Sequence, residues 1–162
     1  MLRDCIIRDA SLTELFVVRS GAMAKLAADL RDRFTQAVLP VNASIQDADV
    51  VPLMDLLDDY NFRRLVCSFG VGFSLNGRGI PIERMRYGKV IVLHDESPKG
   101  KMVAGRVLTI FRLHFPELID AGTIYTATVS RALESELVDV MHSGNRRKSV
   151  VPPAESPPSS GS

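Results

Sequence analysis

The residue types that could support chemistry gather in one short stretch, which begins at His94 and ends at Gly100. Asp95 and Glu96 directly follow an apolar run there, and carboxylate oxygens are the ligands that hard cations such as Mg²⁺ prefer. Asp95 could therefore hold a metal together with Glu96 or Asp120. An acidic pair in a surface turn is more often only solvated, and an aspartate that precedes a helix commonly caps it. We expect Asp95 to cap a helix rather than to bind a metal.

Two histidines are candidates for a general base by residue type. His94 precedes Asp95, and His114 falls on the apolar face of an expected helix. We favour packing or a backbone hydrogen bond as the role of both.

The two cysteines, Cys5 and Cys67, lie far apart and have no metal-ligand spacing with the histidines. We assign no catalytic residue, no metal site and no cofactor.

Apolar runs alternate with amphipathic segments, and this order predicts an α/β fold with a mainly parallel sheet and helices on both faces. The expected strands are 14–18, 37–39, 89–93 and 123–127. The expected helices are 22–34, 47–59, 62–68, 102–114, 115–121 and 130–144. We expect one domain over residues 1–143. Residues 144–162 begin with three basic residues and continue rich in Pro and Ser, so they are predicted to form a disordered tail.

Length and composition narrow the class of protein. The 162 residues are 46% hydrophobic, which is enough for one packed domain. Lys and Arg number 20 against 19 acidic residues, so net charge gives no general attraction to nucleic acid or membranes. No apolar run approaches the roughly 20 residues of a membrane span. We expect a cytoplasmic protein without a membrane partner.

Five fragments, in the same order and at matching separations, resemble the Toprim region of gyrase and topoisomerase IV B subunits. They occupy residues 13–18, 31–33, 36–40, 85–92 and 115–119. In these type IIA DNA topoisomerases the pattern reads T-E-L-F-L-V-E-G-D-S-A, R-D-R, Q-A-I-L-P, L-R-Y-x-K-I-I-I-M-T-D-A-D-V-D-G and P-E-L-I. The similarity covers about residues 11–127. It implies a Toprim-like, Rossmann-like sheet with the site at the carboxyl ends of neighbouring strands.

The resemblance also implies a lost metal site. In the family, a glutamate after the first strand and three aspartates of D-x-D-x-D-G hold magnesium. Arg19 takes the place of the glutamate, Asp95 is retained, and Ser97 and Lys99 replace the other two aspartates. Two unit charges about 4 Å apart interact by roughly 4 kcal/mol at an effective dielectric near 20, so Arg19 and Lys99 would repel a cation. We expect no catalysis, because three of the four carboxylate positions are lost.

A kept scaffold with a removed active site suggests an interaction protein. In the relatives this domain docks against the A subunit at the cleavage gate, so a copy without metal ligands would compete with the genuine B subunit. We therefore expect the chain to bind a type IIA topoisomerase A subunit, from gyrase or topoisomerase IV, or the DNA complex of that subunit, and to modulate or inhibit it.

Two alternatives remain open. The chain could bind duplex DNA by contacting phosphates through Arg19, Lys99, Lys101 and Arg106, although Arg19 and Lys99 could equally be structural partners of Asp95. It could also be a metal-dependent DNA enzyme, such as a nuclease, with a displaced metal site built on Asp95 and Glu96. The last expected helix lies beyond the resemblance and could cap the sheet or mediate self-association.

Overall fold

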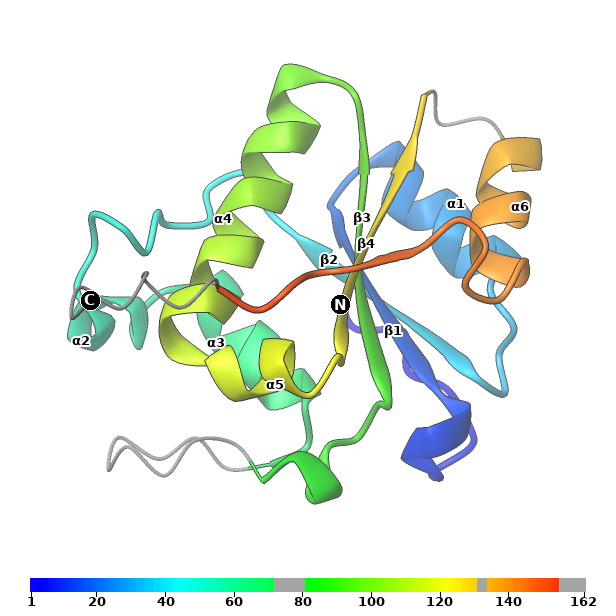
Figure 1. The fold of residues 1–162 in the computed structure, drawn as a ribbon. Helices are drawn as coiled ribbons and strands as arrows, with labels where there is room; N and C mark the ends of the chain where they lie inside the picture. The colour runs from blue at the N-terminus through cyan, green and yellow to red at the C-terminus, as the bar shows by residue number, and fades with distance from the viewer. Residues whose placement is uncertain (72–80, 131–133, 155–162) are drawn as a thin grey trace, which may run out of the picture.

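A five-stranded sheet forms the centre of the molecule (Figure 1). The computed structural model describes residues 1–71, 81–130 and 134–154. The strand order is β2-β1-β3-β4-β5. The parallel strands are β1 (Glu14–Arg19), β2 (Gln36–Val41), β3 (Lys89–Asp95) and β4 (Ile124–Val129), and β5 (Ser149–Val150) pairs antiparallel with β4. The predicted α/β fold with a mainly parallel, Rossmann-like sheet is confirmed.

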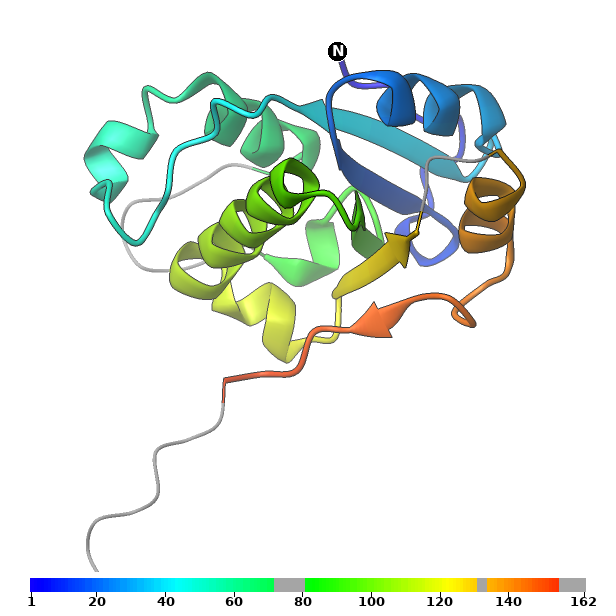
Figure 2. The same ribbon diagram turned by 90° about the horizontal axis from the view of Figure 1, so that it is seen from above.

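Helices cover both faces of the sheet, as Figures 1 and 2 show. On one face lie α1 (Ala22–Leu30) and α6 (Glu134–His142). On the other lie α2 (Leu53–Leu56), α3 (Tyr60–Ser68), α4 (Pro98–His114) and α5 (Pro116–Asp120). Two 3₁₀ turns, η1 (Ala10–Leu12) and η2 (Ile82–Arg84), precede β1 and β3. Because both faces are covered, the parallel strands are almost continuously apolar.

Each face has its own buried core. Phe16 and Ile91 pack with Leu137 under α1 and α6. On the other face, four phenylalanine rings meet with centroids 5.9 to 6.4 Å apart, and they come from α3, α4 and the segments after these helices. These rings are Phe62, Phe69, Phe111 and Phe115. Such distances are typical of favourable aromatic pairs.

Two helices differ from their predicted extents. The helix expected over 47–59 is only the single turn α2, which begins after Pro52, and Val50 and Met54 are 77% and 65% exposed. Val50 and Met54 are spaced as on one face of a helix, but they do not form the buried face that this spacing predicts. The helix expected over 22–34 ends at Leu30, because the Asp32 carboxylate accepts a hydrogen bond from the Phe34 N–H and stabilises a turn instead.

The chain before β1 closes the outer edge of β2. Arg3 exchanges two backbone hydrogen bonds with Val38, at 2.8 and 2.9 Å. The Asp4 carboxylate accepts a hydrogen bond from the Tyr87 hydroxyl at 2.6 Å and one from Arg86 at 3.2 Å. An open sheet edge invites pairing with another chain, and this segment covers part of the β2 edge.

The prediction of a disordered tail from residue 144 is wrong for residues 144–154, which the structure describes as ordered. Val150 pairs with Tyr125 on β4, and the Val151 side chain is buried. The Lys148 ammonium lies 3.0 Å from Glu14 Oε2, and the Lys148 side chain is fully buried. The composition of this segment does not predict these contacts, because the segment has no apolar run. It is ordered instead by the pair between Lys148 and Glu14. The domain therefore extends beyond residue 143, and residues 155–162 of the predicted tail lie outside the described residues.

None of the described helices combines the length and the hydrophobicity that a bilayer span requires.

Replacing Lys148 with Met should lower the free energy of unfolding by about 3 kcal/mol, because the Glu14 carboxylate, whose side chain is only 17% exposed, would lose its cation. Arg146→Gln is the matched control. This substitution removes a positive charge two residues from Lys148. The pair of Arg146 with Asp139 is largely exposed, so the free energy of unfolding should stay close to that of the parent. Urea unfolding of the two variants measures both values. Equal losses would show that the Lys148–Glu14 pair does not hold this segment.

Candidate functional site

The carboxyl ends of β1 and β3 form the position at which open α/β sheets commonly bind ligands. The chain leaves β1 through α1 toward β2, and leaves β3 through α4 toward β4, so the two connections diverge from neighbouring strands. Ligand sites in such folds lie at this divergence. Arg19 is the last residue of β1, and Asp95 is the last residue of β3.

Asp95 joins three elements. Its Oδ1 accepts hydrogen bonds from the Ser97 hydroxyl at 2.5 Å and from the Ser97 N–H at 3.1 Å. Its Oδ2 lies 4.0 Å from the Arg19 guanidinium. The Ser97 hydroxyl in turn accepts from the Gly100 N–H at 3.0 Å and caps α4, whose first residue is Pro98. The prediction that Asp95 itself caps the helix is therefore wrong, since Asp95 instead orients the capping serine.

These contacts favour the ionised form of Asp95. The hydrogen bond from the Ser97 hydroxyl lowers the pKa of Asp95 most, and the Ser97 N–H and the Arg19 guanidinium lower it further against the opposing effect of burial. The carboxylate is thus charged at neutral pH, and its charge is balanced by Arg19 within the protein.

Gly100 is required by the close approach of Asp95. A Cβ atom at this position would lie 2.1 Å from Asp95 Oδ1 and 3.0 Å from the Ser97 hydroxyl. Gly100 also stands at the glycine of the D-x-D-x-D-G pattern. Ser97 and Lys99 stand where that pattern has its second and third aspartates.

The basic residues expected around this position separate in the structure. Lys99 and Lys101 are exposed on the first turn of α4, and neither makes an ion pair within the described part of the chain. Arg106 lies further along α4, where its Nη1 donates a 2.7 Å hydrogen bond to the carbonyl of Ile45. Arg106 thus fixes the loop that follows β2. Of these four basic residues, Arg19 is the one that contacts Asp95 directly.

Both histidines have structural contacts. His94 Nδ1 lies 2.9 Å from the carbonyl of Asp95, and its Nε2 lies 3.3 Å from the Thr128 hydroxyl. His114 packs edge-on against Phe62 with ring centroids 6.3 Å apart, and burial lowers the pKa of His114. These contacts agree with the packing and backbone roles expected for the two histidines.

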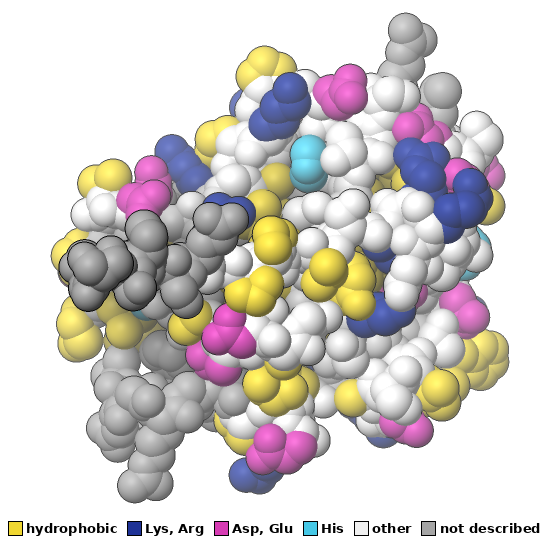
Figure 3. All heavy atoms as spheres, viewed as in Figure 1, with side chains coloured by type: hydrophobic (Ala, Val, Ile, Leu, Met, Phe, Trp, Pro, Cys, Tyr) yellow, Lys and Arg dark blue, Asp and Glu magenta, His cyan; other side chains and the backbone are white. Residues whose placement is uncertain are grey.

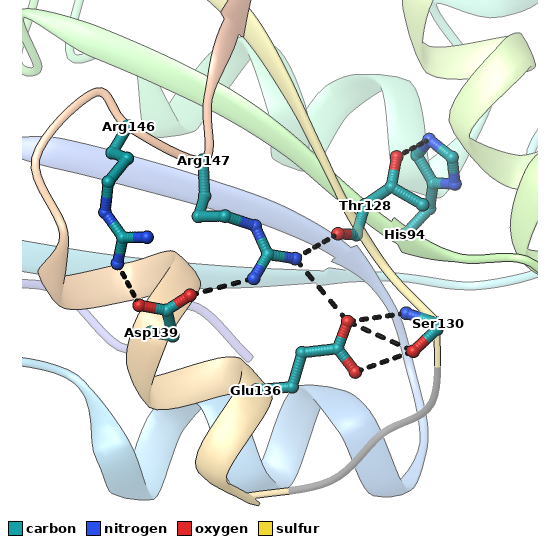
Figure 4. Close-up of polar contacts among 7 residues, drawn as sticks. All are labelled: His94, Thr128, Ser130, Glu136, Asp139, Arg146 and Arg147. Carbon is teal, nitrogen blue, oxygen red and sulfur yellow. Dashed lines mark hydrogen bonds and ion pairs between the residues drawn. The ribbon is translucent and has the colours of Figure 1, made fainter.

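A polar network at the end of β4 was not predicted from the sequence (Figure 4). Arg147 donates to Asp139 at 2.8 Å and to the Thr128 carbonyl at 3.2 Å, and lies 3.5 Å from Glu136. Glu136 also accepts from the Ser130 N–H at 2.8 Å. The network ties the C-terminal segment to α6 and β4, so Arg147 is not the solvated residue that a basic tail would contain. The spacing of Glu136 and Asp139 along one helix face was the only available signal.

Metal ligands do not cluster in the described residues. No three His, Cys, Asp or Glu side chains lie together there in an arrangement that could hold a metal ion. Asp95 instead accepts two hydrogen bonds from Ser97 and lies 4.0 Å from Arg19.

Sequence comparison relates this chain to the B subunit of DNA gyrase. The chain is 32% identical over 126 residues to that protein from Rickettsia felis and from Halalkalibacterium halodurans, and 29% identical to that from Mycoplasma pneumoniae. Each match covers 78% of this chain but only 15% to 19% of the relative. The chain therefore spans less than a fifth of the length of the curated relatives it matches. No protein-family model matches the chain.

Two glycines of α4 allow a matched test of the Asp95 turn. Gly100→Ala should lower the free energy of unfolding by about 2 kcal/mol, because the new methyl group displaces the Asp95 carboxylate. Gly105→Ala, at an exposed position with no atom near the new Cβ, should instead raise it by about 0.5–1 kcal/mol through helix propensity. Thermal and urea unfolding measure both. A stabilising Gly100→Ala would contradict the close approach.

Stability should depend on pH through Asp95. A carboxylate whose pKa is lowered by folding stabilises the protein above its unfolded pKa of about 3.9, and this contribution disappears as the pH falls through the folded pKa. Asp95→Asn should therefore be destabilising by about 1–2 kcal/mol at pH 7, and its difference from the parent should shrink below pH 4. Glu96→Gln removes an exposed neighbouring charge and serves as the control in urea unfolding across this range. A difference for Asp95→Asn that is independent of pH would contradict the assignment.

Proposed function

We propose that this chain is a catalytically inactive Toprim-like domain, related to the B subunits of gyrase and topoisomerase IV, that binds a type IIA topoisomerase A subunit or its DNA complex. Its effect would be to modulate or inhibit that enzyme. The observation that carries the proposal is the ion pair between Arg19 and Asp95, which occupies the place where the resemblance puts two magnesium ligands.

The electrostatics of this position support an inactive site. Arg19 already neutralises the one retained carboxylate at 4.0 Å, and the Ser97 hydroxyl occupies its other oxygen. A divalent cation would have to displace both contacts and would then face the guanidinium. Repulsion between charges about 4 Å apart is of the order of 4 kcal/mol per unit charge at an effective dielectric near 20.

The preserved scaffold supports an interaction role. The strand order, the cap of α4 and the close approach at Gly100 are all in place around the altered site. A competitor for the partner would need the docking surface of such a domain but no catalysis. The similarity to the B subunit of DNA gyrase makes the protein that works with that subunit the natural partner to test.

Binding of DNA through the altered site receives less support. Arg19 is paired with Asp95, and Arg106 is committed to the Ile45 carbonyl. Of the four cations proposed for this role, Lys99 and Lys101 remain, and two phosphate contacts give only weak, salt-sensitive affinity. On the face drawn in Figure 3, the described Lys and Arg side chains alternate with Asp and Glu and form no continuous basic surface.

Calorimetry with purified A subunits of gyrase and topoisomerase IV tests the proposal. The chain should bind at least one of them, with an affinity that does not depend on Mg²⁺, and should reduce supercoiling or decatenation when added in excess over the genuine B subunit. The double variant with Lys99→Glu and Lys101→Glu should bind the A subunit as the parent does, since the proposed contact does not need these lysines.

Absence of binding to both A subunits, with and without duplex DNA, would contradict the proposal. Binding to duplex DNA alone that disappears in the double variant would establish the phosphate-contact alternative instead. Mg²⁺-dependent cleavage of DNA by the purified chain would overturn the inactive assignment.

A further inference from the structure

A hollow of about 560 Å³ lies beside α1, on the side of β1 away from Asp95. Its walls come from α1, from the end of β2 at Pro40, and from the N-terminal segment that pairs with β2. The volume falls within the range of small-molecule sites, which is roughly 300–1,000 Å³. Arg19, Asp95 and Ser97 do not line it, so it is separate from the altered metal position.

Unpaired charges line this hollow. Arg3 and Lys25 contribute two positive side chains, and Asp29 contributes one carboxylate. All three side chains are exposed, and within the described part of the chain no hydrogen bond or ion pair engages them. Lys25 and Asp29 are four residues apart on α1, a spacing at which opposite charges can pair, but they do not pair here. The Arg3 backbone is fixed by its two hydrogen bonds to Val38, so its position is set by the fold. These charges therefore remain available to a ligand.

The rest of the lining is small and apolar. Ala24 and Ala28 lie one turn apart on the same face of α1, and Pro40 lies on β2. A Cβ atom at Gly21, the residue before the helix, would have no atom within 4 Å, which shows open space at this end of the hollow. Small side chains along the helix leave a slot with an apolar wall, into which a flat ring could pack.

We propose that this hollow binds a nucleoside monophosphate. Arg3 and Lys25 would hold the phosphate by charge-assisted hydrogen bonds. Asp29 would accept hydrogen bonds from the sugar hydroxyls, which is how carboxylates bind ribose in nucleotide sites. The base would pack on Ala24, Ala28 and Pro40. A single phosphate fits the charge of the lining, because the Asp29 carboxylate would repel a second phosphate group.

This proposal does not depend on binding to a topoisomerase. To test it, the purified chain is titrated with adenosine monophosphate, and binding is measured by calorimetry and by the shifts of amide NMR signals. Saturable binding should shift amides of α1 and of residues near Pro40. Lys25→Gln should weaken the affinity about tenfold, because one charge-assisted contact is lost. Lys101→Gln, the matched control on α4, should not change it.

Two further arms test the pocket itself. Ala28→Trp fills the hollow and should abolish binding while the protein remains folded by circular dichroism. The parent should bind 2′,3′-dideoxyadenosine monophosphate more weakly than adenosine monophosphate, because the dideoxy sugar has no hydroxyls to donate to Asp29. The Asp29→Asn variant should bind the two nucleotides equally, because it lacks the carboxylate that accepts from these hydroxyls.

Several results would overturn the proposal. These are an absence of saturation with adenosine monophosphate, an equal loss in Lys25→Gln and Lys101→Gln, and full binding to Ala28→Trp. If inorganic phosphate binds as tightly as the nucleotide, the hollow is a simple anion site. If a short DNA strand binds more tightly than the mononucleotide, these contacts belong to DNA.

Discussion

The carboxylate of Asp95 is the contact on which this arrangement depends. It joins the end of β3 to the start of α4 through Ser97, and to the end of β1 through Arg19. Gly100 has no room for a side chain because this carboxylate lies over it. A carboxylate that in the resembling family would face a cation is here balanced within the protein. The turn after β3 is therefore held in place by contacts within the protein.

At the opposite end of the sheet, the start of β1 is joined to the start of β2 and to the C-terminal segment. Glu14, at the start of β1, accepts from the buried Lys148 and from Gln36, and Gln36 also donates to the carbonyl of Met141. The Lys148 ammonium lies 5.3 Å from the ring centre of Phe16, where the ring face adds a favourable contact. The buried Lys148 ammonium thus keeps an anionic partner, and removal of either member of such a pair is strongly destabilising. These contacts fix the amino end of the sheet and leave its carboxyl edge accessible.

Much of the sheet could be predicted because its signals are local. Each parallel strand is a short apolar run, and the expected strands agree with β1, β3 and most of β2 and β4 within a few residues. The C-terminal segment could not be predicted, because Lys148 pairs with a residue 134 positions away. Arg19 and Asp95, which the resemblance places at one site, do meet in the structure. The contact of Arg106 was not foreseeable, because its partner, the Ile45 carbonyl, is brought near only by packing of α4 against the loop after β2.

Placing carboxylates where the resembling family has them tests the proposed loss of a metal site most directly. The claim is that the backbone of a metal site is kept while its charges are reversed. A variant with Arg19→Glu, Ser97→Asp and Lys99→Asp should bind Mg²⁺ in calorimetry, whereas the parent chain should give no binding heat under the same conditions. Binding of Mg²⁺ by the parent as tight as by the variant, or a folded variant that binds none, would contradict the account.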